Sequence, residues 1–265
     1  MAIVLATAIL VACARVPITK RRQLNLIPEA QMIGMSLQAY QEFLDTNQVL
    51  PPTDKKVEMV RSIGNNIKNA VEQFLTQEGQ SKRIENFAWE FNVVAQDVVN
   101  AWCMPGGKVV VYTGILPVTQ DEQSLAVVMG HEIAHAIARH GNERMSQAMG
   151  LQLGGMAISV ALSEKPALTQ NIFLQSYGIG SQLGMLAYGR NHETEADKMG
   201  LIFMAMAGYD PRVAVGFWER MGALGGNKPP ELLSTHPSDE TRAATLKEFM
   251  PTALKYYKPS APPQP

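Results

Sequence analysis

Apolar residues recur along much of this chain at three- and four-residue spacing, which is typical of one buried helix face. Residues 27–44 and 52–75 follow this pattern and predict two amphipathic helices. A third predicted helix begins near Thr119, which forms a capping box with Glu122, and ends at Gly141, a residue suited to the left-handed C′ position. Its apolar positions make one buried stripe: Leu125, Val128, Met129, Ile133, Ala136 and Ile137.

A short β-region precedes the third helix. Residues 100–114 read NAWCMPGGKVVVYTG, where β-branched and aromatic residues flank a Gly-Gly pair and predict strand, turn, strand. Downstream, residues 201–205 continue another helical apolar pattern, which Gly208 and Pro211 end. We therefore expect a mostly helical α+β fold in a single domain, with a small sheet over the third helix.

The third helix contains the segment His131-Glu132-Ile133-Ala134-His135, an HExxH pattern. Its two histidines are four residues apart, so they lie on one helix face, one turn from each other. Two imidazole nitrogens at this spacing can reach one metal ion, and the glutamate beside them can take a proton from a metal-bound water. The pattern predicts one Zn²⁺ per chain on His131 and His135, with Glu132 as the general base.

Two histidines leave the site incomplete, because catalytic zinc usually takes three protein ligands and one water. The extended pattern HExxHxxGxxH does not fit, since Ala138 stands where it needs glycine and Gly141 where it needs histidine. His140 falls on roughly the opposite side of a continuous helix from His131. This position predicts a surface residue or a cation at the helix C-terminus.

The segment His192-Glu193-Thr194-Glu195-Ala196-Asp197 offers the third ligand from a second helix. Glu193 can complete a His-His-Glu set, and Asp197, one turn later, can accept a hydrogen bond from the far nitrogen of a ligand histidine. Glu195 is the alternative ligand, but it is rotated by about 200° from Glu193 and would face elsewhere. A solvated acidic helix start is the other interpretation for Glu195 and His192.

These two segments together resemble the gluzincin metallopeptidases. They resemble more closely the family of the CAAX prenyl protease and the bacterial protease HtpX, metallopeptidase family forty-eight, and the resemblance covers residues 26–251. The most similar branch is the soluble periplasmic one of BepA and LoiP, which is also related to mitochondrial Oma-type proteases. The resemblance implies a zincin-like fold and a metalloendopeptidase that acts on unfolded or extended polypeptides.

The resemblance also implies roles for residues outside the two helices. The family carries a similar Asn-Ala and Pro-Gly-Gly segment, so an edge strand at Asn100 and Ala101 would pair with an extended substrate by β-augmentation. A His-Pro pair and an arginine follow the third ligand in the family, which places His236 and Arg242 near the zinc. Either side chain could stabilise the oxyanion of a tetrahedral intermediate. Alternatively, His236 binds zinc in the resting enzyme and blocks the water.

Composition narrows the class of protein. Hydrophobic residues make up 46% and charged residues 18%, as in a globular chain, and a net charge of −1 gives no electrostatic case for nucleic-acid binding. Residues 149–188 are rich in small and apolar side chains, but their longest unbroken apolar stretch, residues 156–162, is far too short to span a bilayer. HtpX and the prenyl protease have long hydrophobic spans, so this difference favours the soluble branch.

The N-terminus predicts a membrane anchor. Residues 1–12 form the apolar core of a lipoprotein signal peptide, and the sequence LVAC at its end fits a bacterial lipobox with Cys13 as the acylated residue. No lysine or arginine precedes Cys13, which departs from the usual signal peptide. A buried N-terminal helix or a weak membrane anchor are the other interpretations. Ala14 favours the periplasmic face of an outer membrane as the location.

These boundaries divide the chain into four parts. A tether at residues 13–25 follows the signal peptide, the peptidase domain occupies residues 26–257, and a disordered proline-rich tail ends the chain at residues 258–265. The family implies that the enzyme clears misfolded or misassembled envelope proteins, with outer-membrane assembly machinery as a further partner. The alternative function is a zincin-like periplasmic chaperone or binding protein whose zinc is capped or structural.

Overall fold

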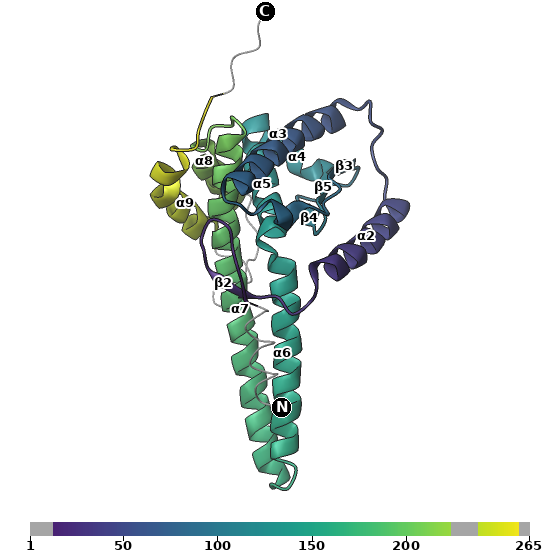
Figure 1. The fold of residues 1–265 in the computed structure, drawn as a ribbon, viewed down its shortest axis with the longest axis vertical. Coiled ribbons are helices and arrows are strands. Elements are labelled where there is room, and N and C mark those ends of the chain that lie inside the picture. Colours follow the sequence, from purple (N-terminus) through teal and green to yellow (C-terminus); the bar gives the residue numbers. More distant parts are fainter. Residues whose placement is uncertain (1–12, 224–237, 260–265) are drawn as a thin grey trace, which may run out of the picture.

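The computed structural model describes residues 13–223 and 238–259. They form a head, which holds the sheet and most of the helices, and two long neighbouring helices that project from it (Figure 1). The predicted mostly helical α+β fold is confirmed.

The elements follow one another in three groups. The first group contains β1 (Cys13–Arg15), β2 (Arg22–Leu24), α2 (Glu29–Thr46), α3 (Lys55–Gln77) and the 3-10 helix η1 (Ser81–Ile84). The second contains β3 (Glu90–Val94), β4 (Ala101–Met104), β5 (Lys108–Tyr112), the 3-10 helix η2 (Thr113–Ile115) and α4 (Leu116–Thr119). The third contains α5 (Glu122–Ala138), α6 (His140–Ala161), α7 (Ala167–Met206), α8 (Val213–Ala223) and α9 (Asp239–Ala253).

The main sheet has three strands in the order β3-β5-β4. β3 runs parallel to β5, and β4 runs antiparallel to it, with Cys103 opposite Val109. The hairpin predicted at residues 100–114 is therefore confirmed, and Gly106 and Gly107 give its turn the positive φ angles of 92° and 82°. β4 is an edge strand of this sheet and lies against α5.

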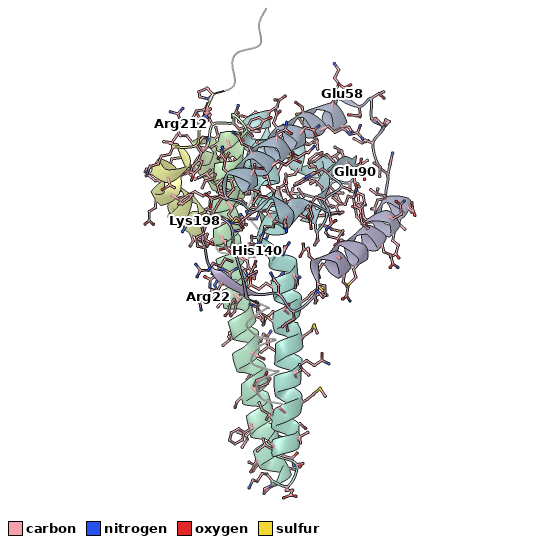
Figure 2. The ribbon with its side chains drawn as sticks, in the orientation of Figure 1. Arg22, Glu58, Glu90, His140, Lys198 and Arg212 are labelled. Carbon is pink, nitrogen blue, oxygen red and sulfur yellow. The ribbon has the colours of Figure 1, made fainter. Side chains whose placement is uncertain are left out.

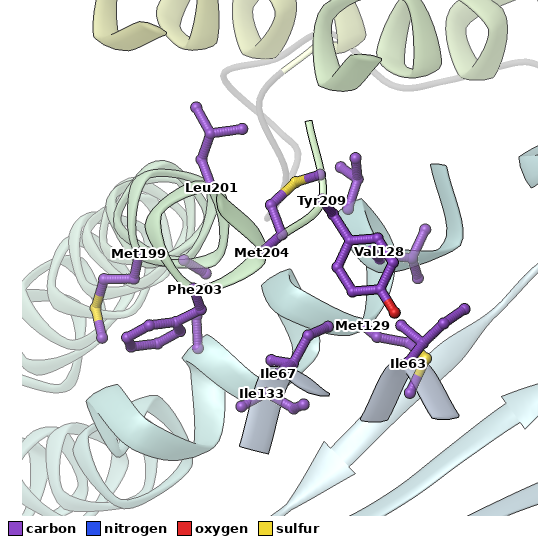
Figure 3. Packing of buried hydrophobic residues seen from close by; sticks show 14 of the residues in the cluster. Ile63, Ile67, Val128, Met129, Ile133, Met199, Leu201, Phe203, Met204 and Tyr209 are labelled. Atoms are coloured by element: carbon purple, nitrogen blue, oxygen red, sulfur yellow. The ribbon is translucent and has the colours of Figure 1, made fainter. Parts of the chain in front are cut away.

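The hydrophobic core surrounds α5. Figure 3 shows Ile67 of α3, Met129 and Ile133 of α5 and Phe203 of α7 in one cluster, and all four side chains are fully buried. The apolar stripe predicted for the HExxH helix thus packs against neighbours on several sides. A helix enclosed in this way holds its side chains rigidly, which a metal site needs.

Both ends of the HExxH helix differ from the prediction. The N-cap is Asp121, whose carboxylate accepts a hydrogen bond from the backbone N–H of Ser124 at 2.7 Å, while Thr119 ends the preceding helix α4. At the other end the helix stops at Ala138, because Arg139 takes the left-handed conformation with φ 61°. The predicted terminator, Gly141, lies inside α6.

The segment expected to be a tether contains the hairpin of β1 and β2, which pair antiparallel. Val16 in its turn is fully buried, and Gln23 is only 2% exposed. The Gln23 amide donates to the backbone carbonyl of Ala138 at 2.7 Å, so it satisfies one of the orphan carbonyls at the C-terminus of α5. The hairpin is thereby docked where α5 turns into α6.

The projecting helices are α6 and the first half of α7 (Figure 1). Large apolar side chains are exposed along them, including Leu153, Met156, Val160, Leu168, Ile172 and Phe173. Within the described ranges, no helix combines the length and apolar character needed to cross a membrane. The segment 192–197 lies in the interior of α7, so the interpretation of an acidic helix start is wrong.

Helices α5 and α7 cross with their backbones in contact at Gly130 and Gly200. A Cβ atom added at Gly200 would lie 2.7 Å from the backbone nitrogen of His131, and one added at Gly130 would lie 2.9 Å from the Gly200 carbonyl oxygen. Any larger residue must push the helices apart. The two glycines therefore set the separation of the helices that carry the HExxH and HETEAD segments.

We expect Gly200→Ala to destabilise the fold by about 1–3 kcal/mol, because its methyl group overpacks the crossing. It should also weaken zinc binding, since the ligand-bearing helices separate. Thermal unfolding and zinc competition with a chelator measure the two effects. The control is Gly184→Ala on the same helix, where no atom lies within 4 Å of the added Cβ. Equal behaviour of the two variants would show that the close crossing is not required.

Candidate active site

The HExxH side chains line the part of α5 that faces α7 and the sheet. His131 is 6% exposed, and Glu132 and His135 are half-buried. The 3.6-residue helical repeat places the two histidines on one side, with ring centroids 4.7 Å apart. Both rings direct Nε2 towards α7, where Glu193 is buried.

Three predicted ligands converge there. The Nε2 atoms of His131 and His135 are 3.1 Å apart, and the two carboxylate oxygens of Glu193 each lie 3.3 Å from one of them. Ligand atoms about 2.1 Å from one tetrahedral ion are about 3.4 Å from each other. Within the described part of the chain, these three residues are the one group of His, Cys, Asp or Glu spaced to hold a metal ion. Their donor set and spacing fit zinc.

Asp197 and Arg242 support the first histidine from behind. The Asp197 carboxylate accepts from Nδ1 of His131 at 2.9 Å. Burial and the charge of Arg242 lower the pKa of His131, but the carboxylates of Asp197 and Glu193 outweigh them and raise it to about 10. In the form that binds a metal the proton would stay on Nδ1 and leave Nε2 free towards Glu193. Arg242 donates to both oxygens of Asp197, at 2.8 and 2.6 Å, and its guanidinium stacks 3.3 Å from the centre of the Trp218 ring.

The surroundings of Arg242 bear on its predicted role. Burial raises the pKa of Asp197, but the charge of Arg242 and the hydrogen bond from His131 outweigh it and hold this pKa below its usual range. Arg242 lies near the metal ligands, as predicted. Arg242 donates two of its hydrogen bonds to Asp197. This favours a role in positioning Asp197 over the predicted stabilisation of an oxyanion.

The second histidine is supported by a residue that was predicted to lie on the surface. His140 is fully buried, and its Nδ1 lies 2.9 Å from Nδ1 of His135. Figure 2 shows His140 where the head meets the projecting helices. The prediction was wrong because it assumed a continuous helix. The left-handed residue Arg139 breaks that helix and turns His140 back towards His135.

Behind His140 lies a buried network of charges. Its Nε2 is 3.0 Å from the Glu195 carboxylate, which accepts from Arg21 at 2.8 and 3.1 Å and from the Thr19 hydroxyl. Arg21 also donates twice to Glu143, at 2.7 Å each. Glu195 faces away from the zinc ligands, as expected. The alternative interpretation, a solvated position for Glu195 and His192, is wrong, since both side chains are buried.

His192 completes this network. Its Nε2 lies 3.0 Å from Glu143, and its ring stacks on that of His140 with centroids 4.3 Å apart. Arg21 and Glu143 were not among the predicted site residues. Arg21 stands in the basic run 20–22, and nothing local distinguishes it from its exposed neighbour Arg22.

The imidazole rings of His135 and His140 are uncharged at neutral pH. Burial lowers the pKa of His135 to about 3 and that of His140 to about 4. A neutral imidazole is the form that binds zinc. Burial thus keeps His135 in the neutral form that a metal ion binds.

Strand β4 lies beside Glu132, the predicted general base. Burial, together with the nearby Glu132 carboxylate, raises the pKa of the Cys103 thiol, which places that carboxylate close to the strand. The edge strand predicted for substrate binding is therefore present next to the HExxH helix. The outermost amide considered for it, that of Ala101, donates to the side-chain oxygen of Asn100 at 2.9 Å, so an added substrate strand would have to replace this bond.

The other predicted site residue is His236, which lies outside the described residues. Ser238, two residues later, caps α9 as expected by accepting from the Thr241 N–H at 3.1 Å. The proposed contact of His236 with zinc stays a prediction.

A protein-family comparison identifies the chain. The model of peptidase family M48 matches residues 64–250, more than half of the 265 residues, and this span contains the three metal-ligand candidates. The chain belongs to peptidase family M48. The family predicted from the HEIAH and HETEAD segments is confirmed.

Three relatives agree with this assignment. Mitochondrial metalloendopeptidase OMA1 of Schizosaccharomyces pombe is 33% identical over 245 residues, which cover 90% of this chain and 66% of that protein. Human mitochondrial metalloendopeptidase OMA1 is 31% identical over 249 residues, covering 90% of this chain and 46% of that protein. The beta-barrel assembly-enhancing protease of Escherichia coli is 30% identical over 164 residues, covering 60% of this chain and 34% of that protein.

The chain spans about a third to two thirds of the length of these relatives. The two OMA1 proteins match more of it than the beta-barrel assembly-enhancing protease does. The narrower prediction, a BepA/LoiP-like branch, is therefore not singled out by these similarities.

The carboxylate network predicts a pH-dependent stability. Burial raises the pKa of Glu143, but hydrogen bonds from Arg21 and His192 outweigh it and lower the pKa to about 2. A pKa depressed in the folded state stabilises the protein above the unfolded value of 4.5, and this stability is lost as pH falls towards 2.

We expect Arg21→Met to lower the free energy of unfolding by about 2 kcal/mol at pH 7, because it leaves buried carboxylates without their cation. The expected loss of stability is smaller than for a fully buried ion pair, because solvent screens the Arg21 side chain, which is 28% exposed. The difference from the parent protein should narrow between pH 4.5 and 2. Urea unfolding across this range measures it, with the exposed Arg22→Met as control. A loss independent of pH would contradict the assignment.

Proposed function

We propose that this protein is a zinc-dependent endopeptidase that cleaves extended segments of polypeptides. The observation that carries the proposal is the convergence of His131, His135 and Glu193 at the spacing of zinc ligands, with Glu132 on the same helix and an edge strand beside it. Membership of peptidase family M48 supports the same activity.

In this proposal, each residue of the site has a separate role. Bound zinc would supply a Lewis acid for the scissile carbonyl and lower the pKa of a water molecule towards ~7. Glu132 takes one proton from the attacking water and returns it to the leaving nitrogen, and the second water proton passes from the new carboxyl group to the amine. The peptide bond thus breaks into a carboxylate and an ammonium group, with no net change in protons. Asp197 and Arg242 hold His131 in the tautomer that the site requires.

The substrate class follows from the edge strand. β4 offers backbone groups to an extended peptide, which gives affinity with little dependence on sequence. Unfolded or misassembled proteins expose such segments. The name of the Escherichia coli relative, a beta-barrel assembly-enhancing protease, supports a role with misassembled envelope proteins and with outer-membrane assembly machinery. The OMA1 relatives are named as mitochondrial, so the proposed envelope role rests on the similarity to the beta-barrel assembly-enhancing protease.

We expect Glu132→Gln to abolish cleavage of unfolded casein while zinc stays bound, because the amide cannot accept the proton. Glu193→Ala should lose both zinc and cleavage, since it removes a ligand. Metal analysis of the purified variants and a casein assay separate the two results. If Glu132→Gln keeps full activity in cells, the alternative function, a zincin-like chaperone with a capped or structural zinc, takes the place of proteolysis.

We also propose a lipid anchor at Cys13, which would hold the enzyme at the periplasmic face of a bacterial membrane, in our proposal the outer membrane. The lipobox sequence LVAC supports it. In a bacterial host, alkyne-labelled palmitate should label the protein, and Cys13→Ser should remove the label and shift the protein to the soluble fraction. Cys103→Ser is the matched control and should keep the label. Unlabelled parent protein would exclude the anchor.

A further inference from the structure

The two histidine ligands are supported by arrangements of the same kind. Behind His131 stand a carboxylate from α7, Asp197, and an arginine from α9, Arg242. Behind His135 stands His140, followed by another carboxylate from α7, Glu195, and by Arg21 from the turn of the N-terminal hairpin. Each arrangement ends on an arginine that lies far away in sequence.

The hydrogen bonds behind His135 have one consistent direction. For Nε2 of His135 to bind a metal it must carry no proton, so the proton sits on Nδ1 and is donated to Nδ1 of His140, 2.9 Å away. His140 then carries its own proton on Nε2 and donates it to Glu195 at 3.0 Å. Every contact pairs one donor with one acceptor.

This matching selects one tautomer for each ring. With the opposite tautomer of His135, its Nδ1 would face the unprotonated Nδ1 of His140, and two buried acceptors would meet without a hydrogen between them. Only the tautomer with its proton on Nδ1 lets His135 donate to His140 and offer Nε2 to the metal. His140 is fully buried, so water cannot replace the missing bond.

We propose that His140 is a positioning residue that holds the metal ligand His135 in its binding tautomer and ring orientation, and that Arg21 of the N-terminal hairpin fixes this support through Glu195. The inference rests on the metal site of the proposed function.

The hairpin is well placed for this role. Thr19 and Arg21 both bind Glu195, and Gln23 caps the end of α5 at Ala138. These contacts join residues 13–24 to the point where α5 turns into α6, one helical turn from His135. The N-terminal segment is thus part of the support of the metal site.

The test measures zinc affinity at pH 7 by competition with a chromogenic chelator. His140→Ala should weaken zinc binding by about 10–100-fold, the usual effect of losing such a partner. His140→Asn should recover most of this loss, because its amide oxygen can take the place of Nδ1 as acceptor. With cobalt(II) as a probe, His140→Ala should shift the visible absorption bands, and His140→Asn should restore them.

The control is Asn142→Ala. Asn142 is 2% exposed and lies two residues from His140 on α6. Its side chain bonds to the Ile27 carbonyl at 2.7 Å and to the Ser146 hydroxyl at 3.1 Å, and neither partner is a zinc-ligand candidate. It should lose stability and keep its zinc affinity. If His140→Ala weakens zinc binding no more than Asn142→Ala does, the inference is overturned.

Two further results keep the test decisive. If His140→Ala does not fold, Arg21→Met replaces it and should weaken zinc binding severalfold, whereas an unchanged affinity overturns the inference. Parent protein that binds zinc but leaves casein intact would refute the proposed peptidase activity alone, because affinity is measured without turnover. Parent protein that binds no zinc would refute both.

Discussion

The close crossing of α5 and α7 is the constraint on which the site depends. Gly130 and Gly200 let the two backbones touch directly beside His131. At this separation a glutamate side chain from α7 reaches both histidines of α5, and its two oxygens lie at equal distances from their Nε2 atoms. With ordinary side chains between the helices, the three donors could not share one ion. The site is thus a property of a helix pair, and the surrounding core keeps that pair together.

The close packing of α5 and α7 also buries carboxylates, and arginines from other parts of the fold neutralise them. Burial of Glu193, Glu195 and Asp197 on one helix brings several carboxylates into a medium of low polarity, which is unfavourable unless each has a partner. Arg242 approaches from the C-terminal side and Arg21 from the N-terminal hairpin, and each neutralises one of these carboxylates. Segments far from the HExxH helix in sequence are therefore needed to make its surroundings stable.

Local sequence reasoning succeeded where the residues share one regular element. The spacing of His131 and His135, and of Glu193 and Asp197, follows from the helical repeat alone, and the structure brings the three predicted ligand candidates together. It failed at the junction of α5 and α6, where Gly141 was expected to end the helix and His140 to face solvent. There Arg139 adopts the left-handed conformation, which is strained for a non-glycine residue. Hydrogen bonds from Gln23 and Arg83 to the Ala138 carbonyl help to offset this strain.

The sequence by itself determined the candidate groups of the site: a pair of histidines, a glutamate between them and a carboxylate pair on another helix. It also determined the mostly helical fold, because periodicity reports which face of each helix is buried. Only the tertiary structure decided which groups stand behind the ligands. The identity of those partners depends on the angle at which helices cross and on the direction from which Arg21 and Arg242 arrive. Both are set by long-range packing, and no local pattern of residues encodes them.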